Sequence, residues 1–148
     1  IREYTVTPGE KTTTISGKGK AGLKQEENYY FFYLPVCYKG ITGKSYAYYN
    51  TSRSKNLYLP ASVDENYSYD IQLPENLTLC TPIQEKKIDN PIGSFKITLT
   101  SEGSSLHIEL ALQIKKQLIT PAEYPAFRSL ITEWTDRTRK PILFKTVQ

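Results

Sequence analysis

Few residues in this sequence could carry out nucleophilic chemistry: one histidine, His107, and two cysteines, Cys37 and Cys80. A Ser, Thr or Cys nucleophile usually needs a histidine base within hydrogen-bond reach and a third group that orients the base. In the strand predicted around it, His107 shares the polar face with Glu109 and Gln113, which indicates a solvated strand residue. Nothing in the local sequence brings either cysteine to that face. We therefore expect no catalytic residues and no enzyme activity.

Motifs for cofactors and metals are missing as well, because no P-loop, H-E-x-x-H or G-x-S-x-G pattern occurs. The glycines and lysines of residues 17–22 lack the strand and helix that flank a phosphate cradle, and a flexible linker explains them. The acids Asp64, Glu65 and Glu102 are interpreted as exposed loop residues. The sequence predicts no cofactor and no metal site.

The two cysteines are too few for a disulfide scaffold and lack the close spacing of a zinc site. Two alternatives stay open for Cys37 and Cys80. They could form one bridge in an oxidising compartment, or they could be buried free thiols that pack as small apolar side chains.

Aromatic side chains are the other candidates for function, since the chain has 12 tyrosines. Several of them crowd two predicted strands, where they could stack on sugar rings or simply pair across the sheet. Cross-strand pairing is the interpretation that we favour. Should these strands bind a ligand, the candidate binding surface is Tyr46, Tyr48, Tyr49 and Arg53.

The net charge of +4 comes from scattered Lys and Arg, without the basic block expected of a nucleic-acid-binding face, so we expect no nucleic-acid partner. No apolar run reaches the roughly 18 residues that a membrane-spanning helix needs. The sequence has no Met, even at position 1, and no signal peptide, so we interpret it as a piece of a longer or processed protein.

Strand patterns dominate the chain from residue 28 onward, after a loosely packed leading segment or linker, residues 1–27, that contains a short strand. The run "NYYFFYLPVC" is typical of a strand that is buried on both faces or paired centrally. Alternation then predicts strands at 44–50, 56–60 and 66–73, and a hairpin formed by "GSFKITLT", a loop at 101–105 and "LHIELALQI". Residues 28–148 are therefore predicted to form an antiparallel β-sandwich domain.

One segment departs from this pattern, because Tyr124, Phe127, Leu130, Ile131 and Trp134 recur at helical spacing. The preceding "TPAE" matches a capping box, with Thr at the N-cap, Pro at the first helical position and Glu reaching back. Pro125 indicates that the first turn is separate from the helix proper. We expect one short architectural helix before a last strand, "RKPILFKTV".

The order of "TSRSKNLYLP", "YSYDIQLPENLTLCTP", "NPIGSFKITL", "TPAEYPAFRSLITEW" and "PILFK" resembles the C-terminal domain of unknown function of bacterial transglutaminase-like proteins and related cysteine-protease-like proteins, over about residues 28–145. The resemblance implies an immunoglobulin-like, non-catalytic domain that follows an N-terminal β domain and a papain-like core. It also implies a periplasmic, cell-surface or secreted location. The family's catalytic Cys, His and Asp belong to the core, and no position of this chain matches them.

Two functions follow as hypotheses. The first is an accessory domain that packs against, or positions, the upstream transglutaminase-like core of the same chain. The alternative is an independent module that binds glycan or peptide through exposed tyrosines.

Overall fold

Antiparallel strands make up most of the chain in the computed structural model, which describes residues 3–35, 41, 52–136 and 141–147. The described residues contain one α-helix, α1 (Tyr124–Thr135), and it directly precedes the last strand, β12 (Pro141–Thr146). The prediction of an all-β antiparallel fold with one short helix before the last strand is confirmed. The predicted strand at 44–50 lies outside the described residues.

The larger sheet has the order β6-β10-β9-β8, built from β6 (Val63–Gln72), β8 (Gln84–Asn90), β9 (Gly93–Glu102) and β10 (Ser105–Ile114). The predicted β9–β10 hairpin is confirmed, since the two strands pair antiparallel along their full length and the predicted inward residues, from Phe95 to Leu99 and from Leu106 to Ile114, are buried. Its loop is shorter than expected, because Glu102 pairs with Ser105 and leaves a two-residue turn. Gly103 takes a φ of 56° there, which favours glycine.

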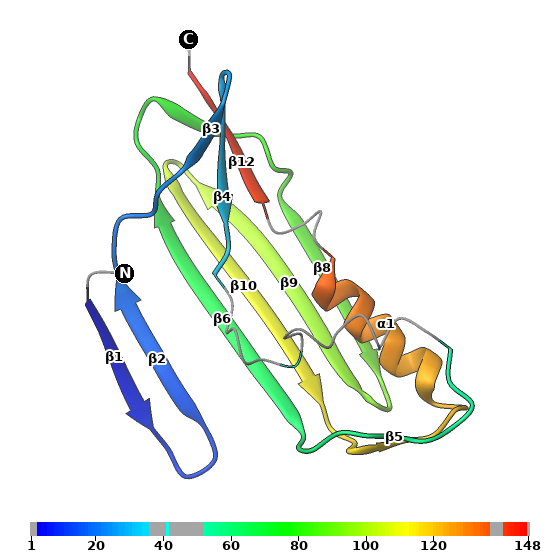
Figure 1. The fold of residues 1–148 in the computed structure, drawn as a ribbon. Helices are drawn as coiled ribbons and strands as arrows, with labels where there is room; N and C mark the ends of the chain where they lie inside the picture. The colour runs from blue at the N-terminus through cyan, green and yellow to red at the C-terminus, as the bar shows by residue number, and fades with distance from the viewer. Residues whose placement is uncertain (1–2, 36–40, 42–51, 137–140, 148) are drawn as a thin grey trace.

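The second sheet has the order β3-β4-β12-β7, with β3 (Lys24–Glu26), β4 (Tyr29–Tyr33) and β7 (Leu77–Leu79) beside β12. It lies over one half of the larger sheet (Figure 1). The core between the layers contains Leu99, Leu106 and Ile108 of the larger sheet, and Ile142 and Phe144 of β12. Two packed antiparallel layers are consistent with the predicted immunoglobulin-like sandwich. Within the predicted run at 28–37, Tyr29–Tyr33 form β4, which is paired on both sides in the second sheet, with β3 and β12.

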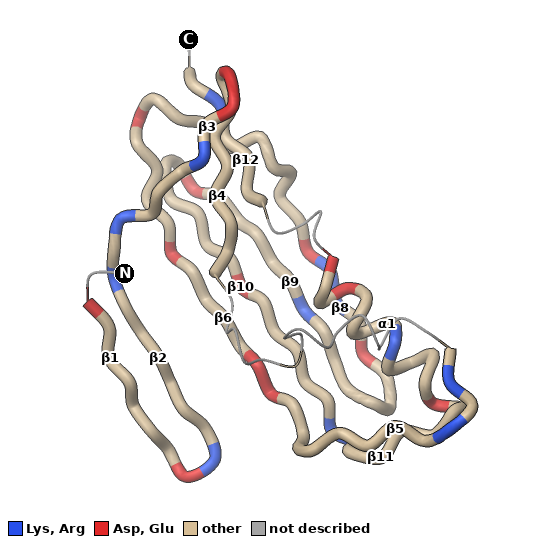
Figure 2. The backbone as a smooth tube through the Cα atoms, viewed as in Figure 1, with Lys and Arg blue, Asp and Glu red and all other residues tan. Residues whose placement is uncertain are grey.

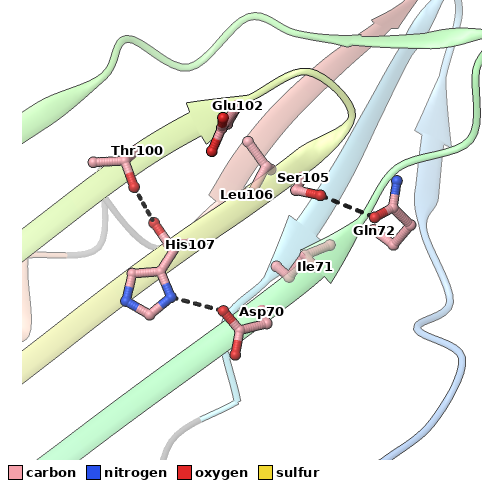
Figure 3. Close-up of a pocket in the computed structure, with 8 residues that line it drawn as sticks. All are labelled: Asp70, Ile71, Gln72, Thr100, Glu102, Ser105, Leu106 and His107. Atoms are coloured by element: carbon pink, nitrogen blue, oxygen red, sulfur yellow. Dashed lines mark hydrogen bonds and ion pairs between the residues drawn. The ribbon is translucent and has the colours of Figure 1, made fainter.

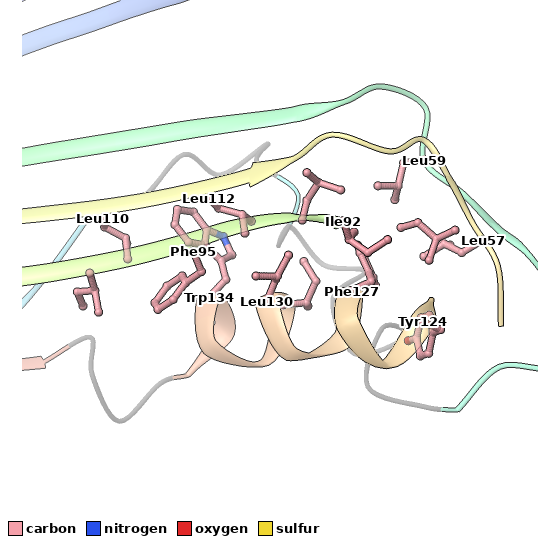
Figure 4. Close-up of a cluster of buried hydrophobic side chains, with 14 residues drawn as sticks. Leu57, Leu59, Ile92, Phe95, Leu110, Leu112, Tyr124, Phe127, Leu130 and Trp134 are labelled. Carbon is pink, nitrogen blue, oxygen red and sulfur yellow. The ribbon is translucent and has the colours of Figure 1, made fainter. Parts of the chain in front are cut away.

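Helix α1 covers the other half of the same inner face (Figures 1 and 4). Its five predicted apolar residues are all buried. They form one core with the small β5 (Leu57–Tyr58) and β11 (Leu118–Ile119) pair, the turn before β9, and inward residues of β9 and β10. These partners are Leu57, Ile92, Phe95, Ile97, Leu110, Leu112, Ile114 and Ile119. The helix thus completes the core where the second sheet ends.

The start of α1 differs from the predicted capping box in one respect. The Glu123 carboxylate accepts a hydrogen bond from the Thr120 backbone N–H at 3.1 Å, as the motif requires of the glutamate, and another from the Thr120 hydroxyl at 3.0 Å. The N-cap, however, is Glu123 rather than Thr120, because residues 121–123 form a separate turn before Pro125. The Lys116 ammonium and the Thr120 hydrogen bonds lower the pKa of Glu123 to about 2.

A separate hairpin, β1 (Glu3–Pro8) and β2 (Thr13–Lys18), stands apart from the two layers (Figure 1). The sequence predicted a short strand within residues 1–27. The described part of this segment has three strands: β1 and β2, of six exposed residues each, and β3, which belongs to the second sheet.

We expect Phe127→Ala to lower the free energy of unfolding by about 3–5 kcal/mol, because Phe127 has no solvent exposure and its removal leaves a cavity between helix and sheet. Urea denaturation followed by tryptophan fluorescence measures the change. Thr132→Ala, on the exposed side of the same helix, is the matched control and should change stability by less than about 0.5 kcal/mol. Equal effects of the two substitutions would show that the helix does not complete the core.

Candidate functional site

The candidate binding surface chosen from the sequence is only partly described. Tyr46, Tyr48 and Tyr49 lie outside the described residues. Arg53 is half-buried at the start of α1, where its guanidinium carbon lies 5.7 Å from the centre of the Tyr124 ring. That distance fits a cation–π contact, and the buried Nε of Arg53 has no hydrogen-bond partner. Arg53 is thus packed on the helix in the structure.

A polar network crosses the outer face of the larger sheet. His107 and Asp70 are directly opposite each other on β10 and β6, and His107 Nδ1 lies 2.7 Å from an Asp70 carboxylate oxygen (Figure 3). His107 Nε2 lies 3.5 Å from Glu109, whose other carboxylate oxygen accepts a hydrogen bond from Lys96 Nζ at 2.8 Å. Thr98 also donates to that oxygen, at 3.4 Å. The network links three neighbouring strands through groups of alternating charge.

The geometry gives His107 two carboxylate neighbours rather than a nucleophile. The nearby Thr100 hydroxyl donates to the backbone carbonyl of His107, at 3.5 Å, and not to the ring. Within the described residues, no Ser, Thr or Cys makes a hydrogen bond to the imidazole, so the pairing that activates a serine or cysteine hydrolase is not formed there. The same part of the chain contains no group of three or more His, Cys, Asp and Glu residues placed to hold a metal ion.

The network borders a shallow hollow of about 310 Å³ at the end of the sheet (Figure 3). Its rim is polar, and the Ser105 hydroxyl donates to the side-chain oxygen of Gln72 across β10 and β6, at 3.0 Å. A small, open and polar hollow differs from the enclosed apolar pockets in which most small molecules bind. A ligand in this hollow would remain in contact with water, and the hollow does not enclose a water-free space for a reaction.

The network shifts the pKa values of His107 and Glu109. The hydrogen bonds to Asp70 and, secondarily, to Glu109 raise the pKa of His107 above its ordinary value of 6.5. Lys96, followed by His107, lowers the pKa of Glu109 in turn. The strand position of His107 was predicted from alternation, while its partner Asp70 comes from the register between β6 and β10.

An exposed row of aromatic residues lies on the outer face of the second sheet. Tyr29, Phe31 and Tyr33 alternate along β4 with the inward Tyr30 and Phe32, and the two outer tyrosines are 44% and 56% exposed. The neighbouring strand β3 places Lys24 opposite Phe31 and Glu26 opposite Tyr29. Lys24 and Glu26 form an ion pair with a distance of 2.6 Å. Tyr29 and Tyr33 belong to the predicted tyrosine-rich strands, but they were not among the chosen binding residues.

Glu65 was wrongly interpreted as an exposed loop acid. It lies within β6 on the inner face, where it accepts a hydrogen bond from the Ile41 backbone N–H at 2.7 Å and another from the Tyr67 hydroxyl at 3.0 Å. The alternation seen from Tyr67 onward extends back through this residue, and that signal could have identified it. Asp64 also lies in the strand, and its side chain is exposed.

Cys80 has a free thiol in the structure and is half-buried, so the free-thiol alternative holds for it. Its Sγ lies 4.0 Å from the Thr78 carbonyl oxygen, beside a hollow of about 410 Å³ lined by Leu73, Leu77 and Ile83 among others. Cys37 lies outside the described residues. The setting of Cys80 is that of a small packed side chain.

Charged residues are dispersed along the described chain, and residues of the two signs are interspersed (Figure 2). Strands β4, β5, β7 and β11 (Leu118–Ile119) carry no Lys, Arg, Asp or Glu, and no described strand carries a continuous basic row. In the part of the chain that the structure describes, no helix combines the length and apolar character needed to cross a bilayer.

Comparisons with known proteins place this geometry in context. A family described as "Domain of Unknown Function with solved-structure structure (DUF3858)" matches residues 28–144. The chain is also similar to the crystal structure of a protein from Parabacteroides distasonis ATCC 8503 that is described as a candidate protease, with 31% sequence identity and a TM-score of 0.72. The match covers 82% of this chain but 24% of that one. Among the curated proteins, a search found no match.

We expect the pKa of His107, measured by NMR from its ring protons, to lie above 6.5 and to fall when Asp70 is replaced by Asn, because the main stabilising partner of the imidazolium loses its charge. The folded-state pKa is the raised one. The stabilisation is therefore complete below the unfolded pKa and disappears as the pH rises through the folded value. Asp89→Asn, on an exposed site of β8, is the control. An unchanged titration in Asp70→Asn would contradict the network.

Proposed function

The chain belongs to the DUF3858 family of domains of unknown function, and on that premise we propose that it is a non-catalytic accessory domain of a larger multidomain protein. Its role is to pack against an upstream transglutaminase-like core of the same polypeptide and to position that core. The observation that carries the proposal is the match to a much longer chain, of which this domain corresponds to 24%. A small part of a multidomain chain fits a supporting role.

The described polar groups support the same proposal. Nucleophilic catalysis needs a base that hydrogen-bonds to its nucleophile, and the described ring contacts of His107 are with Asp70 and Glu109. The solved relative is described as a candidate protease as a whole chain, which is compatible with a papain-like core outside the matched part. In this proposal the catalytic groups belong to that core, and Cys80 does not take part.

The parent protein is proposed to act in the cell envelope or outside the cell. This location rests on the resemblance to transglutaminase-like proteins of bacteria. An accessory domain of this kind would form an interface of the size found between domains of one chain, roughly 600–1,500 Å².

The accessory role is tested by NMR titration of the isotope-labelled chain with its upstream core, expressed separately. We expect backbone amides on one continuous surface to shift, because a docking interface excludes water from one contiguous patch. An unrelated protein of similar size and charge, added at the same concentration, is the control and should cause no shifts. A spectrum that the core leaves unchanged would contradict the proposal.

The aromatic row on β4 favours a second candidate, a module that binds glycan or peptide. Exposed tyrosine rings offer an apolar face for stacking and a hydroxyl for hydrogen bonds. Tyr29 and Tyr33 lie on one side of the same strand, two positions either side of Phe31, with the Lys24–Glu26 pair beside them. The arrangement can accommodate an extended ligand along the strand.

Should this second function hold, the double substitution Tyr29→Ala and Tyr33→Ala should reduce retention on immobilised cell-wall glycan at least about tenfold, since stacking at each ring contributes about 1 kcal/mol or more. Affinity electrophoresis measures the retention. Tyr58→Ala, at another exposed tyrosine on β5, is the matched control and should bind as the unsubstituted chain does. Equal retention of the unsubstituted chain, the double variant and the Tyr58→Ala variant would show that the aromatic row on β4 does not bind glycan.

A further inference from the structure

One side of the β1–β2 hairpin is apolar and uncovered. Val6 and Ile15 are cross-strand partners on this side and are 49% and 66% exposed. Tyr4, two positions from Val6, is 70% exposed and pairs with Gly17, which has no side chain to pack against the ring. We call these residues, Tyr4, Val6 and Ile15, the hairpin apolar face. The opposite side carries hydroxyl-bearing residues, including the pair Thr7 and Thr14.

The hairpin has little support from the rest of the chain. All six residues of each strand are exposed, and among the described strands β1 and β2 pair only with each other. An isolated two-stranded hairpin is at best marginally stable in water, and a third strand or a packed surface normally stabilises it. A regular register of six residue pairs with an exposed apolar side therefore indicates a surface that another structure covers.

Two observations bear on what covers it. The hairpin, at residues 3–18, lies outside the family match of 28–144, so it is not an element of the family domain itself. In the solved relative, the matched part is 24% of the chain, so most of that polypeptide lies outside the match. A hairpin that precedes the family domain is placed to contact the polypeptide on its other side.

The charge of the hairpin restricts the chemistry of the partner surface. Residues 3–18 contain two acids, Glu3 and Glu10, and two bases, Lys11 and Lys18, so the net charge is 2 − 2 = 0. The hairpin apolar face has no charged member. A complementary surface is thus apolar and uncharged, and its affinity should depend little on salt.

We propose that the hairpin apolar face is the surface through which this chain binds the upstream core of its own polypeptide, at an apolar and uncharged patch of that core. This inference rests on the accessory function proposed above and adds the site of contact. In this arrangement the hairpin makes the contact, and residues 19–23 connect it to β3, the first strand of the sandwich.

The test compares the binding of three forms of the complete chain to the separately expressed upstream core by isothermal titration calorimetry. The first form is unsubstituted, and the second carries Val6→Thr and Ile15→Thr, which keep β-branched side chains while removing apolar surface. The third carries Thr7→Ser and Thr14→Ser on the opposite side. We expect the second form to bind at least about tenfold more weakly and the third to bind within about twofold of the unsubstituted chain.

Each other outcome has a definite meaning. If the core binds the Val6→Thr/Ile15→Thr form as tightly as the unsubstituted chain, the hairpin inference is wrong and the accessory function stands. If the core binds none of the three forms, both are wrong. If light scattering shows that the chain alone forms dimers that this form loses, a second copy covers the face and the inference is overturned.

NMR spectra of the substituted forms show whether the substitutions also change the structure of the domain. The amide resonances of residues 24–35 and 52–136 should not move in the substituted forms, because the hairpin stands apart from both sheets. Shifts throughout the sandwich would mean that the hairpin supports the domain itself, which would overturn the inference.

Discussion

The structure depends on how the inner face of the larger sheet is covered. Its central strands, β9 and β10, are each ten residues long, and their inward rows are apolar along most of their length, from Phe95 to Leu99 and from Leu106 to Ile114. The second sheet packs against Leu99, Leu106 and Ile108 at one end, and α1 packs against Phe95 and Leu112 at the other. A sheet this long needs both covers, because uncovered apolar rows would stay in water. This explains why a β protein contains one helix.

Covering the inner face leaves the two outer faces free for interactions. One carries the Asp70–His107–Glu109–Lys96 network and the other carries the aromatic residues of β4. Both groups of side chains project from paired strands rather than from loops, so their positions are fixed by the sheet register. The helix also anchors the edge of the larger sheet. The Lys86 ammonium binds Glu133 at 2.5 Å and the Asn90 amide donates to the Ala126 carbonyl at 3.1 Å.

Much of this fold could be predicted from the sequence, since alternation identifies the β9–β10 hairpin, the face of β6 from Tyr67 and the stripe of α1. Strand β8 was missed for a physical reason. Its inward row includes Lys86 and Asn90, whose polar ends are satisfied by α1, and so the strand has no apolar alternation to detect. Only the tertiary structure supplies these partners.

The candidate site was less predictable. The solvated strand position of His107 followed from alternation. Its pairing with Asp70, 37 residues away in the sequence, depends on the register between β6 and β10. Tyr29 and Tyr33 are exposed because the face of β4 with Tyr30 and Phe32 packs against the core. A run in which five aromatic residues are consecutive gives no alternation that would indicate this. The capping glutamate was identified, but the N-cap shifted because Pro125 delays the helix.

The charges on the two edge strands of the larger sheet affect whether copies of the domain associate through these edges at high concentration. Strand β6 carries Asp64, Glu65 and Asp70, and β8 carries Glu85, Lys86, Lys87 and Asp89. Within the described residues, each of these strands has one hydrogen-bonded neighbour, and an open strand edge is a template for a strand from another molecule. Bringing two copies of β6 edge to edge would oppose carboxylates and strip water from them. The larger sheet therefore resists growing into a fibril-like stack.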